Sequence, residues 1–129
     1  MKIRLLITAL AAIAVFSVAV ITSADGVTKR IKFAKGRSSA TVSNSVIRGD
    51  RDTYIVGAKA GQRMTVKITS LESNAVFQIQ DPSGNYLLDA GEEADATNVT
   101  NSLPENGDYR IIVGGTRGNA SYKLTVVIK

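Results

Sequence analysis

Two pairs of closely spaced carboxylates are the residues of this chain best suited to acid–base chemistry. Asp50 and Asp52 are two positions apart, and Glu92 and Glu93 are adjacent. Such pairs can cleave a glycosidic bond when one carboxyl acts as the acid and the other as base or nucleophile. The chain has no histidine and no cysteine, which removes the usual general base, the usual thiol nucleophile and the commonest zinc ligands. Since acidic pairs are common in exposed loops, we expect a protein that is not an enzyme and has no cofactor.

The acidic stretch from Glu92 to Asp95 raises the separate question of a bound cation. Ca²⁺ needs only oxygen ligands, which these side chains could supply. The stretch lacks the Asp-x-Asp-x-Asp-Gly spacing of a calcium loop, so we assign no metal site and keep cation binding as an open alternative. Because residues 90–98 are the least patterned part of the chain, we expect them to form a mobile acidic loop.

Short runs of alternating apolar and polar residues dominate the chain after residue 25. Met64, Val66 and Ile68 alternate with polar residues, and no stretch keeps apolar residues at helical spacing for three turns. Segments rich in Gly, Pro, Asn and Asp separate the runs and predict hairpin and Greek-key turns. The sequence therefore predicts an all-β fold, an antiparallel Greek-key β-sandwich of about 8–9 short strands, with a closed barrel as the alternative. The expected strands are 30–34, 40–47, 53–58, 63–70, 75–80, 86–89, 97–102, 107–113 and 122–128.

The core of this sandwich should be thin and aliphatic. Aromatic residues make up 5% of the chain and tryptophan is absent, so Val, Ile, Leu and Ala must fill most of the interior. The last run carries its apolar residues on one side up to the end of the sequence, and we expect its truncation to unfold the domain.

The first 24 residues have the pattern of a secretory signal peptide. A short cationic start precedes an apolar run over residues 5–21, and Thr22 and Ala24 are the small residues before a cleavage site. We expect a signal-peptide helix over 1–24, cleavage after Ala24, and one β-sandwich domain over 25–129 in the periplasm or outside the cell. The alternative is a retained anchor, since the apolar run approaches the length of about 17 residues that spans a bilayer. After cleavage we expect no stable membrane insertion.

The charge balance is mildly basic. The chain has 16 Lys and Arg against 11 Asp and Glu, and loss of the signal segment leaves a net charge of +3. A nucleic-acid binder masses basic residues and aromatics on one stripe, whereas the local basic cluster here, within residues 29–37, fits an exposed strand and turn. We predict no nucleic-acid partner.

Several short segments between residues 33 and 120 form an ordered set of motifs. They are FAKGRSSA at 33–40, Asp52-Thr53-Tyr54, AKAGQ at 58–62, Leu103-Pro104 followed by GDY at 107–109, and Thr116-Arg117 followed by Ala120. In these segments the chain resembles the periplasmic inhibitors of g-type lysozyme and the related inhibitors of i-type lysozyme, over nearly all of residues 30–129. The AKAGQ and Asp-Tyr pieces are also similar to the wider prepeptidase C-terminal-like sandwich group, so they inform on fold more than on function.

The resemblance implies an exported inhibitor whose loop residues occlude the active-site cleft of a g-type or i-type lysozyme. Its more discriminating motifs are Asp52-Thr53-Tyr54 and Thr116-Arg117-x-x-Ala120. Arg117 could pair with a carboxylate of the cleft, and Tyr54 could stack where a sugar would lie, provided that the two residues are close together. The alternatives are a half-buried strand tyrosine and a solvated turn arginine. The predicted partner-binding residues are Tyr54, Arg117, Asp52, Arg51 and Asn119.

Two departures from the family pattern bear on this interpretation. The segment after Arg117 lacks a basic extension that family members often carry, and the segment 74–101 differs from the inhibitor pattern. A positively charged domain would also gain little long-range attraction toward a cationic lysozyme.

A noncatalytic periplasmic β-sandwich that binds cell-wall glycan or a protein partner is the alternative function. Sugar platforms use exposed aromatic residues, which are scarce here. A homodimer through an edge strand is a further open alternative.

Overall fold

The computed structural model describes residues 26–129 as strands joined by turns and loops. The predicted signal segment, residues 1–24, lies outside the described residues. Within residues 26–129, no helix is long and apolar enough to cross a membrane.

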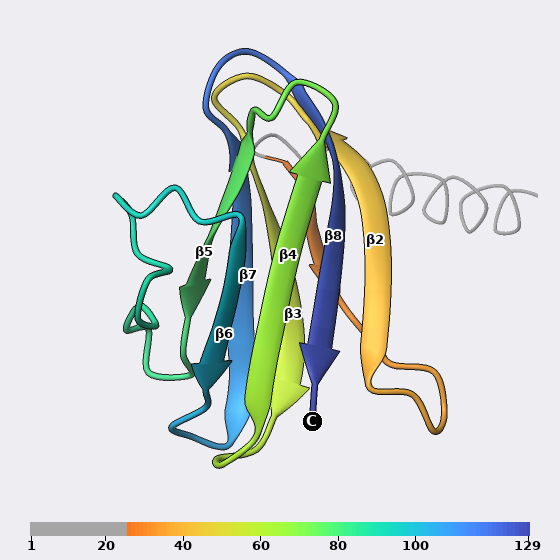
Figure 1. Ribbon diagram of the computed structural model, residues 1–129, viewed down its shortest axis with the longest axis vertical. Coiled ribbons are helices and arrows are strands. Elements are labelled where there is room, and N and C mark those ends of the chain that lie inside the picture. Colours follow the sequence, from red (N-terminus) through yellow and green to blue (C-terminus); the bar gives the residue numbers. More distant parts are fainter. Residues whose placement is uncertain (1–25) are drawn as a thin grey trace, which may run out of the picture.

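The described residues form two four-stranded sheets packed face to face (Figure 1). All neighbouring strands are antiparallel except β1, which runs parallel to β3 at the edge of its sheet. The predicted all-β sandwich is therefore confirmed, with one parallel pair added. The first sheet has the order β1 (Thr28–Arg30), β3 (Arg51–Ala58), β7 (Gly107–Gly115) and β5 (Ala75–Gln80), and the second has β2 (Ser39–Val46), β8 (Ala120–Ile128), β4 (Arg63–Ser70) and β6 (Asn98–Ser102).

Successive strands alternate between the two sheets. Odd-numbered strands build the first sheet and even-numbered strands the second, so strands adjacent in the described sequence are never neighbours in a sheet. This is the connectivity of a jelly roll, in which Greek keys interlock. The predicted turns are present, and the one at 81–85 folds the chain back antiparallel onto β5 as a hairpin turn would, with Tyr86 bridging Gln80. The connections between named strands are not hairpins, because each one crosses from one sheet to the other.

The predicted strands 63–70 and 75–80 match β4 and β5. The predicted strand 86–89 is wrong, since Tyr86 makes one isolated bridge to Gln80 and the backbone of Asp89 then has a positive φ of 62°. The first predicted strand, 30–34, is also misplaced, because pairing with β3 involves Thr28–Arg30.

Inward-facing side chains of both sheets form a single core. Aliphatic residues supply most of it, as predicted, but Tyr54, Phe77 and Tyr109 are among its largest fully buried side chains. The Tyr109 hydroxyl donates to the backbone oxygen of Glu105 at 2.7 Å and accepts from its N–H at 3.0 Å. This tyrosine therefore fastens the crossing between β6 and β7, and its burial raises the pKa of its hydroxyl.

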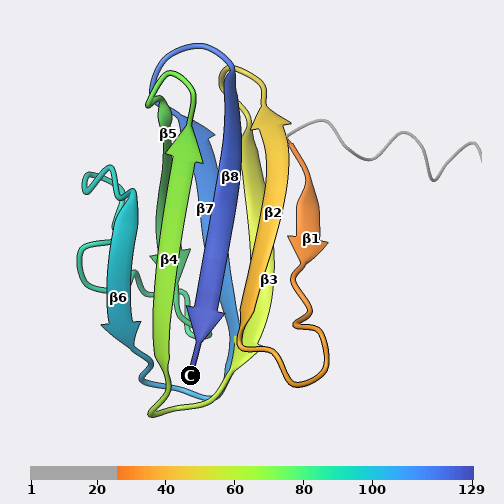
Figure 2. The same ribbon diagram turned by 45° about the vertical axis from the view of Figure 1, so that its right-hand side comes forward.

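The acidic loop is fastened along the outer edge of β5. The N–H groups of Phe77 and Ile79 donate to the backbone oxygens of Ala96 and Ala90, both at 3.0 Å, and both alanines are buried. The loop lies beside β6, on the side of the molecule opposite β1 and β2 (Figure 2). In the described part of the chain, no three acidic side chains gather in a way that could hold a metal ion.

Candidate functional site

Three loops meet at one end of the sandwich, at the top of Figure 1. They are residues 47–50 between β2 and β3, 71–74 between β4 and β5, and 116–119 between β7 and β8. We refer to them together as the three-loop end. The topology brings them together because β2, β4 and β7 all finish at this end of the sheets. Of the predicted site residues, Arg117 and Asn119 belong to it, and Arg51 directly follows its first loop.

Hydrogen bonds join the 116–119 loop to both of its neighbours. The Nη2 group of Arg117 donates to the backbone oxygen of Glu72 at 2.7 Å. On the other side, the N–H of Arg48 donates to the Oδ1 atom of Asn119 at 2.7 Å. The three loops are thus held as one unit, with Arg117 and Arg48 on its exposed surface.

The residue that anchors this unit from below is Asn74, whose side chain is 2% exposed. Its Nδ2 group donates to the backbone oxygens of Arg117 at 3.1 Å and Asn119 at 3.0 Å, and its own backbone oxygen accepts from Thr116 at 2.9 Å. Sequence reasoning missed Asn74. Local sequence offers no signal for it, because asparagine side chains are predicted to bond to backbone a few positions away, whereas these bonds reach across 43 and 45 residues.

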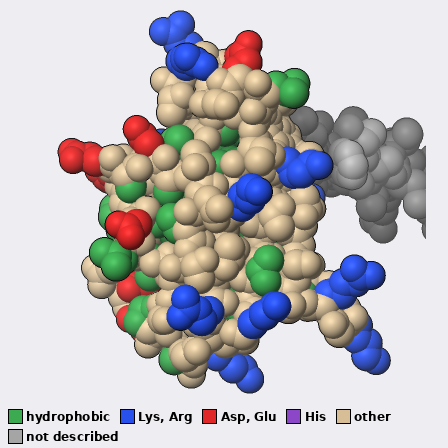
Figure 3. Space-filling model, in the orientation of Figure 1, with side chains coloured by type: hydrophobic (Ala, Val, Ile, Leu, Met, Phe, Trp, Pro, Cys, Tyr) green, Lys and Arg blue, Asp and Glu red, His purple; other side chains and the backbone are tan. Residues whose placement is uncertain are grey.

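Two aliphatic side chains stand in solvent on the same end. Leu71 is 98% exposed and Ile47 is 64% exposed, although both belong to tight turns where polar residues would serve. Figure 3 shows charged side chains of both signs at the upper tip of the molecule, with apolar atoms nearby. The three-loop end therefore combines exposed arginines, an exposed Glu72 and apolar surface, and arginine beside apolar surface is typical of protein contacts.

The interior behind this end holds the other two predicted site residues. Tyr54 is 1% exposed and Asp52 is 2% exposed, and both face the core from β3. The predicted exposure of Tyr54 is therefore wrong, and neither side chain can touch a partner directly in this fold. The inward positions Asp52, Tyr54 and Val56 share a face, but apolar Ile55 on the opposite face obscured the alternation.

Asp52 and Tyr54 are linked through Tyr122 of β8. The Tyr122 hydroxyl donates to Asp52 Oδ2 at 2.6 Å and lies 2.5 Å from the Tyr54 hydroxyl. Because a hydroxyl has one proton to donate, Tyr54 must be the donor to Tyr122. Asp52 Oδ1 accepts from the N–H of Val27 at 3.0 Å. This buried chain of bonds joins the two sheets, and burial, together with the bonds to Asp52 and Tyr54, raises the pKa of Tyr122.

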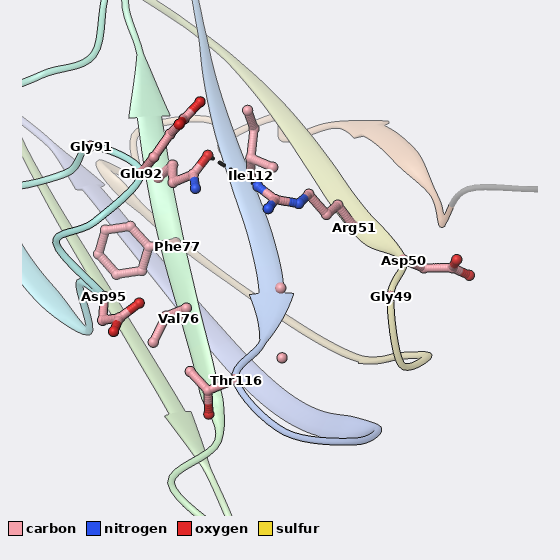
Figure 4. A pocket seen from close by; sticks show the side chains of 13 residues that line it. Gly49, Asp50, Arg51, Val76, Phe77, Gly91, Glu92, Asp95, Ile112 and Thr116 are labelled. Carbon is pink, nitrogen blue, oxygen red and sulfur yellow. Dashed lines mark hydrogen bonds between the residues drawn. The ribbon is translucent and has the colours of Figure 1, made fainter.

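A hollow of about 330 Å³ opens beside the three-loop end, on the outer face of the first sheet (Figure 4). Arg51 lies across β7 within it, and its Nη1 group donates to Gln78 Oε1 at 3.2 Å. Glu92 and Asp95 of the acidic loop line the opposite side. The Tyr86 hydroxyl donates to Glu92 at 3.0 Å, and this bond raises the pKa of Tyr86. Arg51 therefore lies in a hollow next to the three-loop end, whereas Arg117 belongs to that end itself.

Comparisons with known proteins address the whole domain. No family model matches the chain. It is 30% identical over 119 residues to an inhibitor of g-type lysozyme from Escherichia coli strain K12, covering 88% of this chain and 78% of that protein. The crystal structure of PliG from Aeromonas hydrophila, a periplasmic inhibitor of g-type lysozyme, is similar with a TM-score of 0.69 at 33% identity, over 82% of this chain and 100% of that one.

A third similarity concerns the fold alone. The pre-peptidase C-terminal domain of a Bacillus anthracis collagenase has a TM-score of 0.56 at 20% identity, over 77% of this chain and 93% of that domain. The predicted likeness to the prepeptidase C-terminal-like group is confirmed at the level of architecture.

Proposed function

Because the chain belongs to the family of periplasmic inhibitors of g-type lysozyme, we propose that it is a noncatalytic, exported protein that inhibits a g-type lysozyme in the periplasm. We further propose that its three-loop end occludes the active-site cleft of the enzyme. The E. coli and A. hydrophila relatives are inhibitors of g-type lysozyme, and i-type lysozyme is kept as an alternative target in the experiment below.

The observation that carries the mechanism is the fixed position of Arg117. Its side chain is held by Glu72, and its backbone oxygen is held by the buried Asn74. A guanidinium has more N–H donors than this one side-chain bond uses, so Arg117 can still pair with a carboxylate. The cleft of a glycoside hydrolase contains catalytic carboxyl groups. A preorganised cation loses little conformational entropy on binding, which favours tight contact.

The exposed aliphatic residues supply the second contribution to binding. Complete burial of a leucine or isoleucine side chain is worth about 1.5–3 kcal/mol, and Leu71 and Ile47 are the exposed aliphatic residues of the three-loop end. This contribution does not depend on long-range attraction, which is weak between two basic proteins.

The predicted contact residues divide into roles at the surface and in the interior. Arg117 makes the direct contact, and Asn119 holds the neighbouring loop through its bond to Arg48. Arg51 borders the contact in the adjacent hollow. Tyr54 and Asp52 support the end of the sandwich from inside the core.

The test is titration of g-type lysozyme activity with the purified protein and its Arg117→Ala variant. We expect the variant to inhibit at least about thirtyfold more weakly, the effect of losing about 2 kcal/mol at a binding hot spot, with an unchanged melting temperature. Arg63→Ala is the matched control, because Arg63 is an exposed arginine at the opposite end of the sandwich. Equal inhibition by wild type and Arg117→Ala would contradict the proposed contact.

The same assay separates the alternatives. Full activity of g-type lysozyme at micromolar wild-type protein rejects the proposed function, and inhibition of i-type enzyme alone would identify the other target. Retention on insoluble peptidoglycan without inhibition of any lysozyme would favour the glycan-binding alternative.

A further inference from the structure

The outer edges of the two sheets differ in how well they are covered. The edge of β5 is covered by the acidic loop, which takes up the N–H groups of Phe77 and Ile79. β1 is three residues long and carries Lys29 and Arg30, and short charged strands resist pairing with other chains. β6 has five residues, and its Asn101 side chain donates at 2.9 Å to the backbone oxygen of Leu88, which lies just before the acidic loop. β2 is the remaining edge.

β2 has none of these protections along its length. It has eight residues, Ser39–Val46, with no charged residue and no proline. Its inward-facing Ala40 and Val42 are only partly buried, whereas Val126 of the neighbouring β8 is fully buried. A long, uncharged edge strand with an incompletely covered apolar row is the kind of edge that pairs with another strand.

The backbone of β2 offers a defined set of unused groups. The N–H of Ile128 donates to the backbone oxygen of Ser38 at 2.8 Å. The backbone groups of Ser38 therefore point toward β8. Backbone groups in an antiparallel pair alternate, so Ala40, Val42 and Asn44 also face β8, and Ser39, Thr41 and Ser43 face outward. The next outward N–H, of Ser45, is taken up by the Asn44 side chain at 2.8 Å. The open segment is therefore centred on Thr41.

We propose that β2 pairs antiparallel with β2 of a second copy of this chain, about a two-fold axis at Thr41. Thr41 then faces its counterpart, and Ser39 faces Ser43 of the second copy, so each outward backbone group meets its complement. Two-fold pairing of identical strands is self-complementary, and the lack of charge avoids repulsion between like residues. The partly buried Ala40 and Val42 gain cover from the same residues of the other copy.

The pairing also fixes the placement of the three-loop ends. β2 finishes at this end of the molecule, and antiparallel pairing reverses its direction in the second copy. The two three-loop ends therefore lie at opposite ends of the joined sheet, away from the strand pair at its centre. Such a dimer would present two separate binding ends, so dimerisation and inhibition can be tested independently.

The test is analytical ultracentrifugation of protein exported from the full chain, from micromolar to millimolar concentration. We expect the wild-type mass to double as the concentration rises. Thr41→Pro removes the central outward N–H and leaves the backbone bonds to β8 in place, although it loses the 3.3 Å hydroxyl contact with Thr125, as Thr41→Val also does. It should keep the monomer mass. Thr41→Val keeps that N–H, loses only the hydroxyl and should dimerise like wild type.

A second variant keeps the proposal testable if the proline variant does not fold. Thr41→Lys introduces a charge at the two-fold axis without changing the backbone, and it should also stay monomeric with a circular dichroism spectrum like that of wild type. Monomer mass for the wild type at millimolar concentration would overturn the proposal, and so would a dimer of folded Thr41→Lys that is as stable as the wild type.

Discussion

At the scale of single residues, the buried bonds of Asp52 matter more for the structure than its place in a family motif. Both of its carboxyl oxygens have partners, Val27 on one side and Tyr122 on the other. If Asp52 loses the hydroxyl that donates to it, the carboxylate stays buried without that partner, which lowers the free energy of unfolding by about 1–3 kcal/mol. Removal of the Tyr54 hydroxyl, the first donor of the chain of bonds, lowers it by less, because no buried carboxylate loses its donor. Tyr122 and Tyr54 therefore differ in importance although both are buried tyrosines.

Replacement of Tyr122 with Phe should lower the free energy of unfolding at neutral pH by about 1–3 kcal/mol, because Asp52 Oδ2 loses its donor. Tyr54→Phe should cost about 1 kcal/mol or less, since Asp52 keeps its bond to Tyr122. Urea denaturation of both variants measures the difference. Equal losses would show that the direction of the bonds deduced here is wrong.

The free energy of unfolding should depend on pH differently in wild type and in Tyr122→Phe, because the pKa of Tyr122 is raised in the folded protein. The folded state keeps this hydroxyl protonated, whereas an unfolded tyrosine ionises near pH 10. The unfolded state thus binds fewer protons above that pH, and stability falls as the pH rises past about 10. Tyr122→Phe should show a shallower alkaline loss than wild type, with Tyr109 still contributing because its pKa is also raised.

At the scale of elements, the sequence predicted strands well and their partners poorly. Strands such as β4 follow from alternation within the strand itself, which the sequence displays directly. Pairing depends on which sheet the chain enters after each turn, and a turn such as 59–62 has the same Gly and polar residues in a hairpin as in a crossing. The exposure predicted for Tyr54 failed for a related reason, because the polar Asp52 and the apolar Ile55 each break the alternation that would have marked the inward face of β3.

All three loops of the three-loop end are such crossings, and Asn74 is the buried residue that positions the 116–119 loop. Asn74→Ala should weaken lysozyme inhibition several-fold without removing any surface group, because the backbone of Arg117 and Asn119 loses its anchor. Amide hydrogen exchange at Thr116 and Arg48 should become faster, since both amides are protected by bonds within this unit.

Asn106→Ala is the matched control for this prediction. Asn106 also bonds to loop backbone, accepting from the N–H of Ala60 at 2.8 Å, but at the opposite end of the sandwich. It should leave inhibition and the exchange of Thr116 unchanged. Slow exchange and full inhibition in Asn74→Ala would rule out the positioning role.

At the scale of the whole molecule, stability depends on strands at the centre of each sheet. β8 lies between β2 and β4, and besides the small Ala120 it buries four large side chains, Tyr122, Leu124, Val126 and Ile128. At about 1.5–3 kcal/mol each, their burial amounts to roughly 6–12 kcal/mol. That is comparable to the total stability of a typical domain, about 5–15 kcal/mol.

Truncation of residues 124–129 should therefore abolish cooperative folding, because β2 and β4 lose their shared partner and the core loses three of these side chains. Near-ultraviolet circular dichroism and thermal unfolding measure the effect. Internal deletion of β1 is the comparison, since this edge strand is short, exposed and paired on one side, and the shortened chain should still unfold cooperatively at a lower temperature. A cooperative transition in the chain truncated at residue 123 would mean that the sheet can close without its central strand.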